Sequence, residues 1–82
     1  MQKAPSQELI LLGGKIKKIR EKKLMSQSTL ASMCDVDIRT IQRIEKGEYG
    51  FGVPLLFAIA NALDIKVESL VKNISSKKTN SI

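Results

Sequence analysis

The stretch from Gln27 to Gly47, QSTLASMCDVDIRTIQRIEKG, constrains the fold of this chain more than any other segment. Its apolar residues recur at the spacing of a buried helical face, first over 30–34 and then over 38–44. Only residues 35–37 separate the two runs. A joint this short cannot hold a crossover between parallel strands, but it suits two helices that meet at a steep angle. The sequence therefore predicts two short helices joined by a tight corner.

Local signals mark the ends of both helices. Ser26 is a good N-cap for a helix that begins at Gln27, because its hydroxyl can accept from backbone amides of the first turn. Asp37 suits the same role in the second helix, and Gly47 can take the left-handed conformation that ends it. Gln27 would lie beside amides that favour a phosphate oxygen; the alternative is an ordinary solvent-facing side chain.

The second helix carries polar residues on its outer side. Because Ile41 and Ile44 face inward, the side chains expected outside are Arg39, Thr40, Gln42, Arg43 and Lys46, with Ile38 partly exposed in the first turn. Arginine and glutamine can bond guanine and adenine edges bidentately, and threonine can reach a phosphate or a thymine methyl group. This composition is typical of a helix that reads bases in the major groove.

Composition narrows the remaining possibilities. A chain of 82 residues forms one domain, and it has no histidine and a single cysteine, Cys34. The usual zinc sites, histidine-based catalysis and an internal disulfide are therefore not expected, and Cys34 is interpreted as a small buried hydrophobe. We expect no enzyme, no metal and no cofactor. Without a signal peptide or a long apolar run, the chain is expected to be cytoplasmic and not in a membrane.

The positive charge is unevenly distributed. The net charge is +6, and residues 15–23, KIKKIREKK, hold five lysines and one arginine against one glutamate. Such a stripe indicates either a partner that carries phosphate or a solvated helix face. Charge alone does not distinguish the two.

Helical patterns also flank the central stretch. Residues 9–23 are amphipathic, and Gly13 and Gly14 allow either a close helix crossing or a late start of this helix. Pro54 suits the first turn of a fourth, apolar helix. A fifth helix is expected from Val67 to about Lys72, and it is too short to be stable unless it packs on another element.

These features together resemble the phage repressor and Cro-type regulators, or XRE family. The matching residues are Ile19-Arg20, Ser26-Gln27-Ser28-Thr29-Leu30-Ala31, Val36, Ile41, Ile44, Glu45 and Gly47, followed by Leu56, Ala60, Leu63, Ile65, Val67, Glu68 and Leu70. The resemblance covers residues 13–71. It implies an all-α, compact five-helix domain with a helix-turn-helix, the lambda-repressor-like fold, over residues 8–72. Residues 1–7 are expected to be a flexible arm and residues 73–82 a disordered basic tail.

The resemblance also implies roles for residues outside the central pair of helices. Arg20 and Glu45 occupy the positions of a buried ion pair. In the loop 47–53, Tyr49, Gly50 and Gly52 are candidate phosphate contacts, although the loop could simply be a turn with Phe51 in the core. The candidate dimer interface comprises Leu63, Ile65, Leu70 and Val71, or else these residues only close the monomer core.

Two positions depart from the family pattern. Leu24 and Asp35 stand where glycines usually end the first two helices. Asp35 tolerates left-handed geometry, whereas Leu24 does not fit it easily, so the first helix is expected to end differently.

The expected function is sequence-specific binding to double-stranded DNA as a transcriptional regulator, a repressor that acts as a homodimer on a near-palindromic operator. Base contacts are assigned to Ile38, Arg39, Thr40, Gln42 and Arg43, and phosphate contacts to Gln27, Lys46, Tyr49, Gly50 and Gly52. The alternative is an antitoxin that binds a toxin protein and regulates its own operon. A membrane-surface or RNA-binding role for the lysine-rich helix is a weaker hypothesis.

Overall fold

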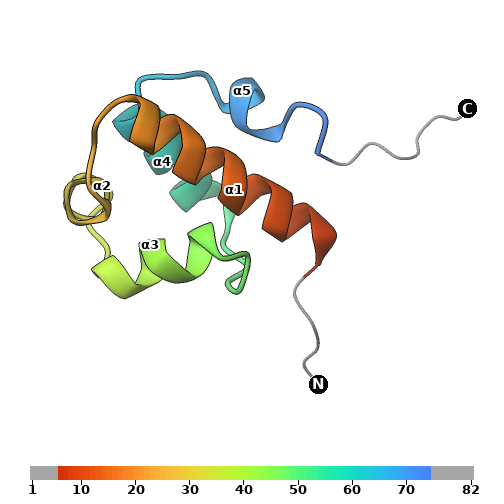
Figure 1. Ribbon diagram of the computed structural model, residues 1–82, viewed down its shortest axis with the longest axis horizontal. Helices are drawn as coiled ribbons and strands as arrows, with labels where there is room; N and C mark the ends of the chain where they lie inside the picture. Colours follow the sequence, from red (N-terminus) through yellow and green to blue (C-terminus); the bar gives the residue numbers. More distant parts are fainter. Residues whose placement is uncertain (1–5, 75–82) are drawn as a thin grey trace, which may run out of the picture.

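The computed structural model describes residues 6–74, and within this range it contains five helices and no strand. They are α1 (Gln7–Lys22), α2 (Gln27–Met33), α3 (Ile38–Glu45), α4 (Val53–Ala62) and α5 (Val67–Val71). In Figure 1, α2 and α3 lie on one side of the long α1, α5 lies on the other, and α4 lies behind α1. Helix α1 packs against α3 and α5, while α2 packs against α3 and α4. The all-α, five-helix prediction is confirmed.

Helix α1 is continuous through its two glycines. Ser6 is the N-cap and accepts from the Leu9 amide at 3.1 Å, so residues 6 and 7 belong to the domain rather than to the expected arm. A Cβ at Gly13 would lie 2.1 Å from the carbonyl oxygen of Ile44, whereas one at Gly14 would meet nothing within 4 Å. Gly13 therefore permits a close crossing of α1 and α3. The rest of the expected arm, residues 1–5, and residues 75–82 of the expected tail lie outside the described residues.

The ends of α2 and α3 follow the local signals. The Ser26 hydroxyl accepts from the Thr29 amide at 3.0 Å, and Asp37 accepts from the Arg39 amide at 2.9 Å. Gly47 has φ 77° and turns the chain after α3. These three predictions are confirmed because each depends on hydrogen bonds within a few residues of the chain.

Helix α1 ends in the same way even though it lacks the usual glycine. Leu24 adopts φ 56°, its amide donates to the Glu21 carbonyl at 2.9 Å, and the Met25 amide donates to the Arg20 carbonyl at 3.0 Å. The expectation of a different ending is wrong. The Leu24 side chain is 94% exposed, so no neighbouring group obstructs the left-handed conformation, and the two hydrogen bonds hold the turn. Asp35 takes φ 59°, as expected.

The core draws on all five helices and their connections. Its fully buried large side chains are Ile16, Leu30, Ile41, Ile44, Ile59, Leu63 and Leu70. Leu63 and Leu70 are 0% exposed, so they close the monomer core and cannot belong to the candidate dimer interface as predicted. Phe51 packs against the same core. Cys34 is buried, and burial raises the pKa of its thiol, which keeps the group protonated and apolar in character. Over residues 6–74, no helix has the length and apolarity needed to cross a membrane.

Candidate nucleic-acid interface

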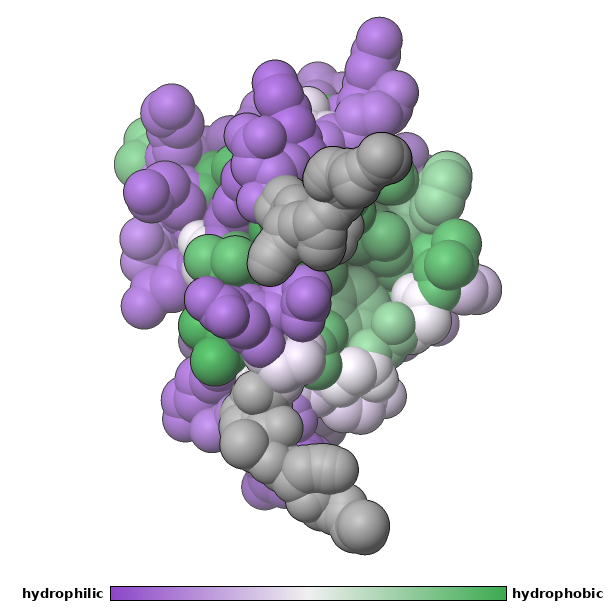
Figure 2. All heavy atoms as spheres, turned by 90° about the vertical axis from the view of Figure 1, so that its right-hand side faces the viewer, coloured by the Kyte–Doolittle hydropathy of each residue, from purple (hydrophilic) through white to green (hydrophobic). Residues whose placement is uncertain are grey.

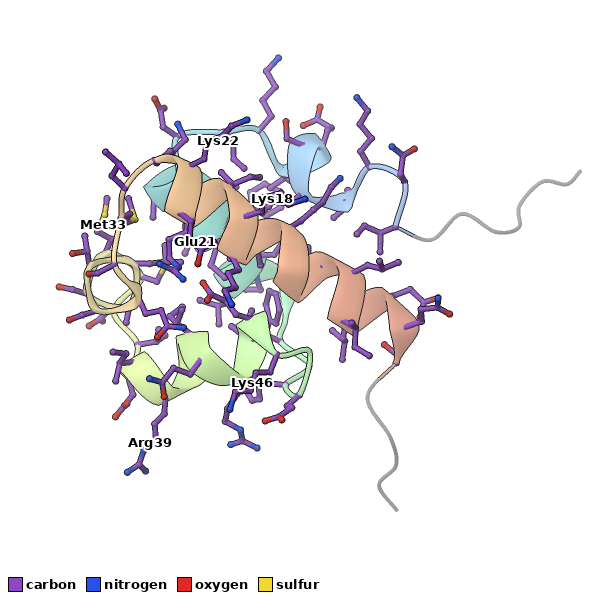
Figure 3. The ribbon with its side chains drawn as sticks, in the orientation of Figure 1. Lys18, Glu21, Lys22, Met33, Arg39 and Lys46 are labelled. Atoms are coloured by element: carbon purple, nitrogen blue, oxygen red, sulfur yellow. The ribbon has the colours of Figure 1, made fainter. Side chains whose placement is uncertain are left out.

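Helix α3 separates a buried side from a polar exposed side. Ile41, Ile44 and Glu45 are buried, and the residues expected outside do reach the surface. Arg39, Arg43 and Lys46 are exposed, Thr40 and Gln42 are half-buried, and Ile38 is 39% exposed. Figure 3 shows Arg39 and Lys46 at opposite ends of α3, with Arg39 projecting away from the other helices. The exposed side of α3 is therefore a narrow surface of hydrogen-bond donors.

A buried ion pair fixes α3 to α1. Arg20 Nε donates to Glu45 Oε2 at 2.6 Å, and Arg20 Nη2 donates to Glu45 Oε1 at 3.1 Å. Arg20 Nη1 also donates to the Met25 carbonyl at 2.7 Å. The two residues are 7% and 8% exposed. Hydrogen bonding to Glu45 raises the pKa of Arg20 above its ordinary value, against the effect of burial, so the guanidinium stays charged inside the domain.

Gln27 joins this ion pair to the start of α2. Its Nε2 donates to Glu45 Oε1 at 3.0 Å, and the side chain is half-buried. Gln27 is therefore not an ordinary solvent-facing residue, and its side-chain amide is already partly engaged by Glu45. One carboxylate, Glu45, holds the start of α2, the end of α1 and the last turn of α3 in fixed relative positions.

A polar hollow of about 300 Å³ opens where α1, α2 and α3 meet. Its lining residues are Lys17, Gln27, Gln42, Glu45 and Lys46. Lysine and glutamine donors around such a hollow suit a phosphate oxygen. Lys17 was not singled out from the sequence. The sequence feature that could have identified Lys17 is its position three residues before Arg20, because this spacing places both side chains on the side of α1 that faces α3.

The other lysines of α1 lie elsewhere. Lys15 Nζ donates to the carbonyl oxygens of Ser69 at 3.3 Å and Lys72 at 2.8 Å, at the end of α5. Lys18 and Lys22 leave α1 on the side away from α3 (Figure 3). Most of the charge stripe is thus separate from the exposed side of α3.

The loop after α3 returns to that surface. Tyr49 is 39% exposed, Gly50 and Gly52 are exposed, and Gly52 is the N-cap of α4. The guanidinium carbon of Arg43 lies 5.8 Å from the centroid of the Tyr49 ring. The three loop residues assigned to phosphate therefore reach the surface, and Tyr49 lies against a side chain assigned to bases.

A second, apolar surface lies between α4 and α5. We define the α4–α5 surface by Phe57, Ile65 and Val67, which line an open hollow of about 520 Å³. Phe57 is 51% exposed. Figure 2 shows that hydrophobic side chains also gather on the face of the molecule that lies at the right-hand side of Figure 1. Two residues of the predicted dimer interface reach the surface: Val71 is 40% exposed and Ile65 is half-buried.

Comparison with known proteins agrees with this arrangement. The family model described as helix-turn-helix matches residues 16–70, which is more than half of the chain. The chain belongs to the XRE family of helix-turn-helix proteins. No curated protein sequence is similar enough to count as a match.

Solved structures of XRE-type regulators share the fold. The restriction-modification controller protein C.AhdI from Aeromonas hydrophila is 28% identical, with a TM-score of 0.77 over 79% of this chain and 98% of that one. A variant of the controller protein C.Esp1396I, bound to its operator site, is 31% identical, with a TM-score of 0.74 over 87% and 99%. The clp gene regulator ClgR from C. glutamicum, 20% identical over 85% and 90%, has a TM-score of 0.78 and supports the fold alone.

As an XRE-family protein, the chain is a helix-turn-helix DNA-binding regulator of transcription. In this family arrangement, α2 and α3 are the two motif helices, and α3 corresponds to the second helix of the motif, which in helix-turn-helix proteins generally lies in the major groove.

Proposed function

We propose that this protein is a repressor that binds a specific, near-palindromic duplex sequence as a dimer. One observation carries the proposal: α3 directs arginine and glutamine side chains outward while its inner side is fixed by the buried Arg20–Glu45 pair. Pre-organised donors on a rigid helix are what discrimination between base pairs requires. The operator-bound structure of the related C.Esp1396I variant supports the same use of the fold.

The contacts divide into two classes in this proposal. Base edges are contacted by Arg39, Gln42 and Arg43, with Ile38 and Thr40 placed to meet thymine methyl groups. Phosphates are contacted by Gln27, Lys46 and the amides of Gly50 and Gly52, and we add Lys17 because it lines the same hollow as Gln27 and Lys46. The phosphate contacts position the protein, and the base contacts choose the sequence.

The proposed dimer uses the α4–α5 surface together with Val71. Half-exposed aromatic and aliphatic side chains around an apolar hollow are typical of a small interface. A dimer that binds a near-palindromic operator needs its two α3 helices in successive major grooves, about 34 Å apart. No observation favours the antitoxin alternative, because the related solved structures described above are controller proteins and gene regulators.

The primary test is selection of bound sequences from a pool of random duplex DNA at about 150 mM salt. We expect one enriched sequence with two inverted half-sites about 10 base pairs apart. Binding that is equal for all sequences and fades with salt would instead indicate contact with phosphate alone and would overturn the proposal.

Two substitutions separate base reading from phosphate binding. Arg43→Ala should weaken binding to the selected site by about 1–3 kcal/mol and relax the preference at one base pair. Lys46→Ala should weaken binding to selected and random duplexes alike and reduce the salt dependence by about one phosphate contact. Equal losses on both duplexes for Arg43→Ala would show that Arg43 contacts only phosphate.

The dimer is tested by sedimentation equilibrium of Phe57→Ser beside a matched control, Met33→Ser. Both substitutions replace an apolar side chain that is more than half exposed, and Met33 lies in α2, outside the α4–α5 surface. Phe57→Ser should shift the protein to monomer and Met33→Ser should not. A wild-type protein that stays monomeric at about 100 μM, far above the Kd of a specific dimer, would contradict this part of the proposal.

A further inference from the structure

We propose that the ring of Tyr49 is a positioning residue for Arg43: it holds the guanidinium where that side chain reads a base. The inference rests on the proposed function of α3, and it assigns to Tyr49 a role different from phosphate contact. A phosphate contact uses the phenolic hydroxyl, whereas positioning uses only the aromatic ring.

The backbone after α3 brings Tyr49 back onto the helix. The Gly47 amide donates to the Ile44 carbonyl at 3.0 Å, and the Glu48 amide donates to the Arg43 carbonyl at 2.9 Å. These two hydrogen bonds hold the loop against the turn of α3 that carries Arg43. Gly47 is required, because it has φ 77° and a Cβ there would lie 2.7 Å from the backbone of Ile10. Tyr49 follows two residues later, over the side chain of Arg43.

The contact leaves the guanidinium available. Its central carbon is 5.8 Å from the ring centroid, within the roughly 6 Å over which a cation is attracted to an aromatic face. Among residues 6–74, Arg43 has no carboxylate partner and no side-chain hydrogen bond, in contrast to Arg20. Because the face of the ring has no strong acceptor atom, the N–H donors of Arg43 remain free for guanine O6 and N7.

Holding an arginine before binding raises affinity. A long side chain that becomes ordered only in the complex weakens binding by about two- to tenfold, and prior restraint removes part of this loss. The gain in affinity applies only to the complex in which Arg43 makes a directional contact with a base. The affinity for the selected duplex should therefore rise, and the affinity for a random duplex should not. Arg39 is exposed and makes no cation–π contact among residues 6–74, so it serves as an internal comparison.

The experiment measures the Kd of Tyr49→Phe and Tyr49→Leu by fluorescence anisotropy, on the selected duplex and on a random duplex of equal length. Each substitution is also combined with Arg43→Ala and, as the matched control, with Arg39→Ala. We expect Tyr49→Phe to bind as the wild type does, and Tyr49→Leu to lose about two- to tenfold on the selected duplex only. In the Arg43→Ala background, Tyr49→Leu should cause no further loss of affinity for the selected duplex. In the Arg39→Ala background, it should cause the same loss as in the wild type.

Three results would overturn the inference. The first is an equal loss in Tyr49→Phe and Tyr49→Leu, which would assign the effect to the hydroxyl. The second is no loss in Tyr49→Leu, and the third is a loss that persists beside Arg43→Ala. If the wild type selects no sequence, the proposed function fails.

The ring contact is then tested alone in DNA-free protein. We expect an upfield ring-current shift of the Arg43 Cδ protons, which Tyr49→Phe should keep and Tyr49→Leu should lose.

Discussion

Glu45→Ala should remove most of the stability of the domain. Arg20 is 7% exposed in the wild-type structure, and the substitution leaves its guanidinium with the Met25 carbonyl at 2.7 Å and only a distant carboxylate, that of Glu21, at 3.9 Å. Gln27 loses its acceptor as well. Breaking a buried pair by removing one partner costs about 3–5 kcal/mol, because the other charge stays uncompensated. A chain of this length has a total stability of roughly 4–12 kcal/mol, so the variant should be marginal or unfolded, and DNA binding should fall with it.

Urea unfolding followed by far-UV circular dichroism measures this loss. With an m-value of about 1–3 kcal/mol per molar urea, the midpoint should fall by at least about 1 M. Glu48→Ala is the matched control, since it removes the same charge from an exposed position three residues away and should change stability by no more than about 0.5 kcal/mol. The double variant with Arg20→Met and Glu45→Leu, which leaves no unpaired charge, should recover much of the loss. A Glu45→Ala protein with the wild-type midpoint would refute the reasoning.

Four further substitutions probe the end of α1 and its crossing with α3 through the same unfolding measurement. Leu24→Gly should stabilise the domain by about 0.5–1 kcal/mol because it relieves a left-handed leucine, and Leu24→Ala, which keeps a Cβ, should not; equal gains would show that exposure of the leucine matters instead. Gly13→Ala should cost about 1–3 kcal/mol because its Cβ meets the Ile44 carbonyl. Gly14→Ala, one residue away in open space, should raise the free energy of unfolding by up to about 1 kcal/mol. Equal effects at the two glycines would mean that the helix crossing relaxes freely.

Features set by neighbouring residues could be predicted from the sequence. The caps at Ser26 and Asp37 and the turn at Gly47 depend on hydrogen bonds to residues two to five positions away, so their side-chain chemistry was sufficient. The Arg20–Glu45 pair joins residues 25 positions apart. Its pairing was implied by the family resemblance and could not follow from helical periodicity alone.

Features set by contacts between distant elements were missed or wrongly assigned. Periodicity showed that Leu63 and Leu70 lie on apolar faces, but it could not show whether the monomer or a second copy covers them. Residue preference alone does not predict the left-handed Leu24, because two backbone hydrogen bonds hold this turn. The contact of Tyr49 with Arg43 depends on the path of the loop after Gly47.

The division of α3 into a bonded side and a free side determines which residues can be exchanged to change the target sequence. Arg39 projects into solvent, so evolution or design can replace it one residue at a time with little effect on folding. Arg43 differs, because the ring of Tyr49 lies against it, and a new residue there calls for a matching change in the loop. Glu45 is constrained more strongly still, since α1 and α2 both bond to it. A retargeted protein would therefore be obtained most readily by changing Arg39 first, then Arg43 and Tyr49 as a pair, with Glu45 left unchanged.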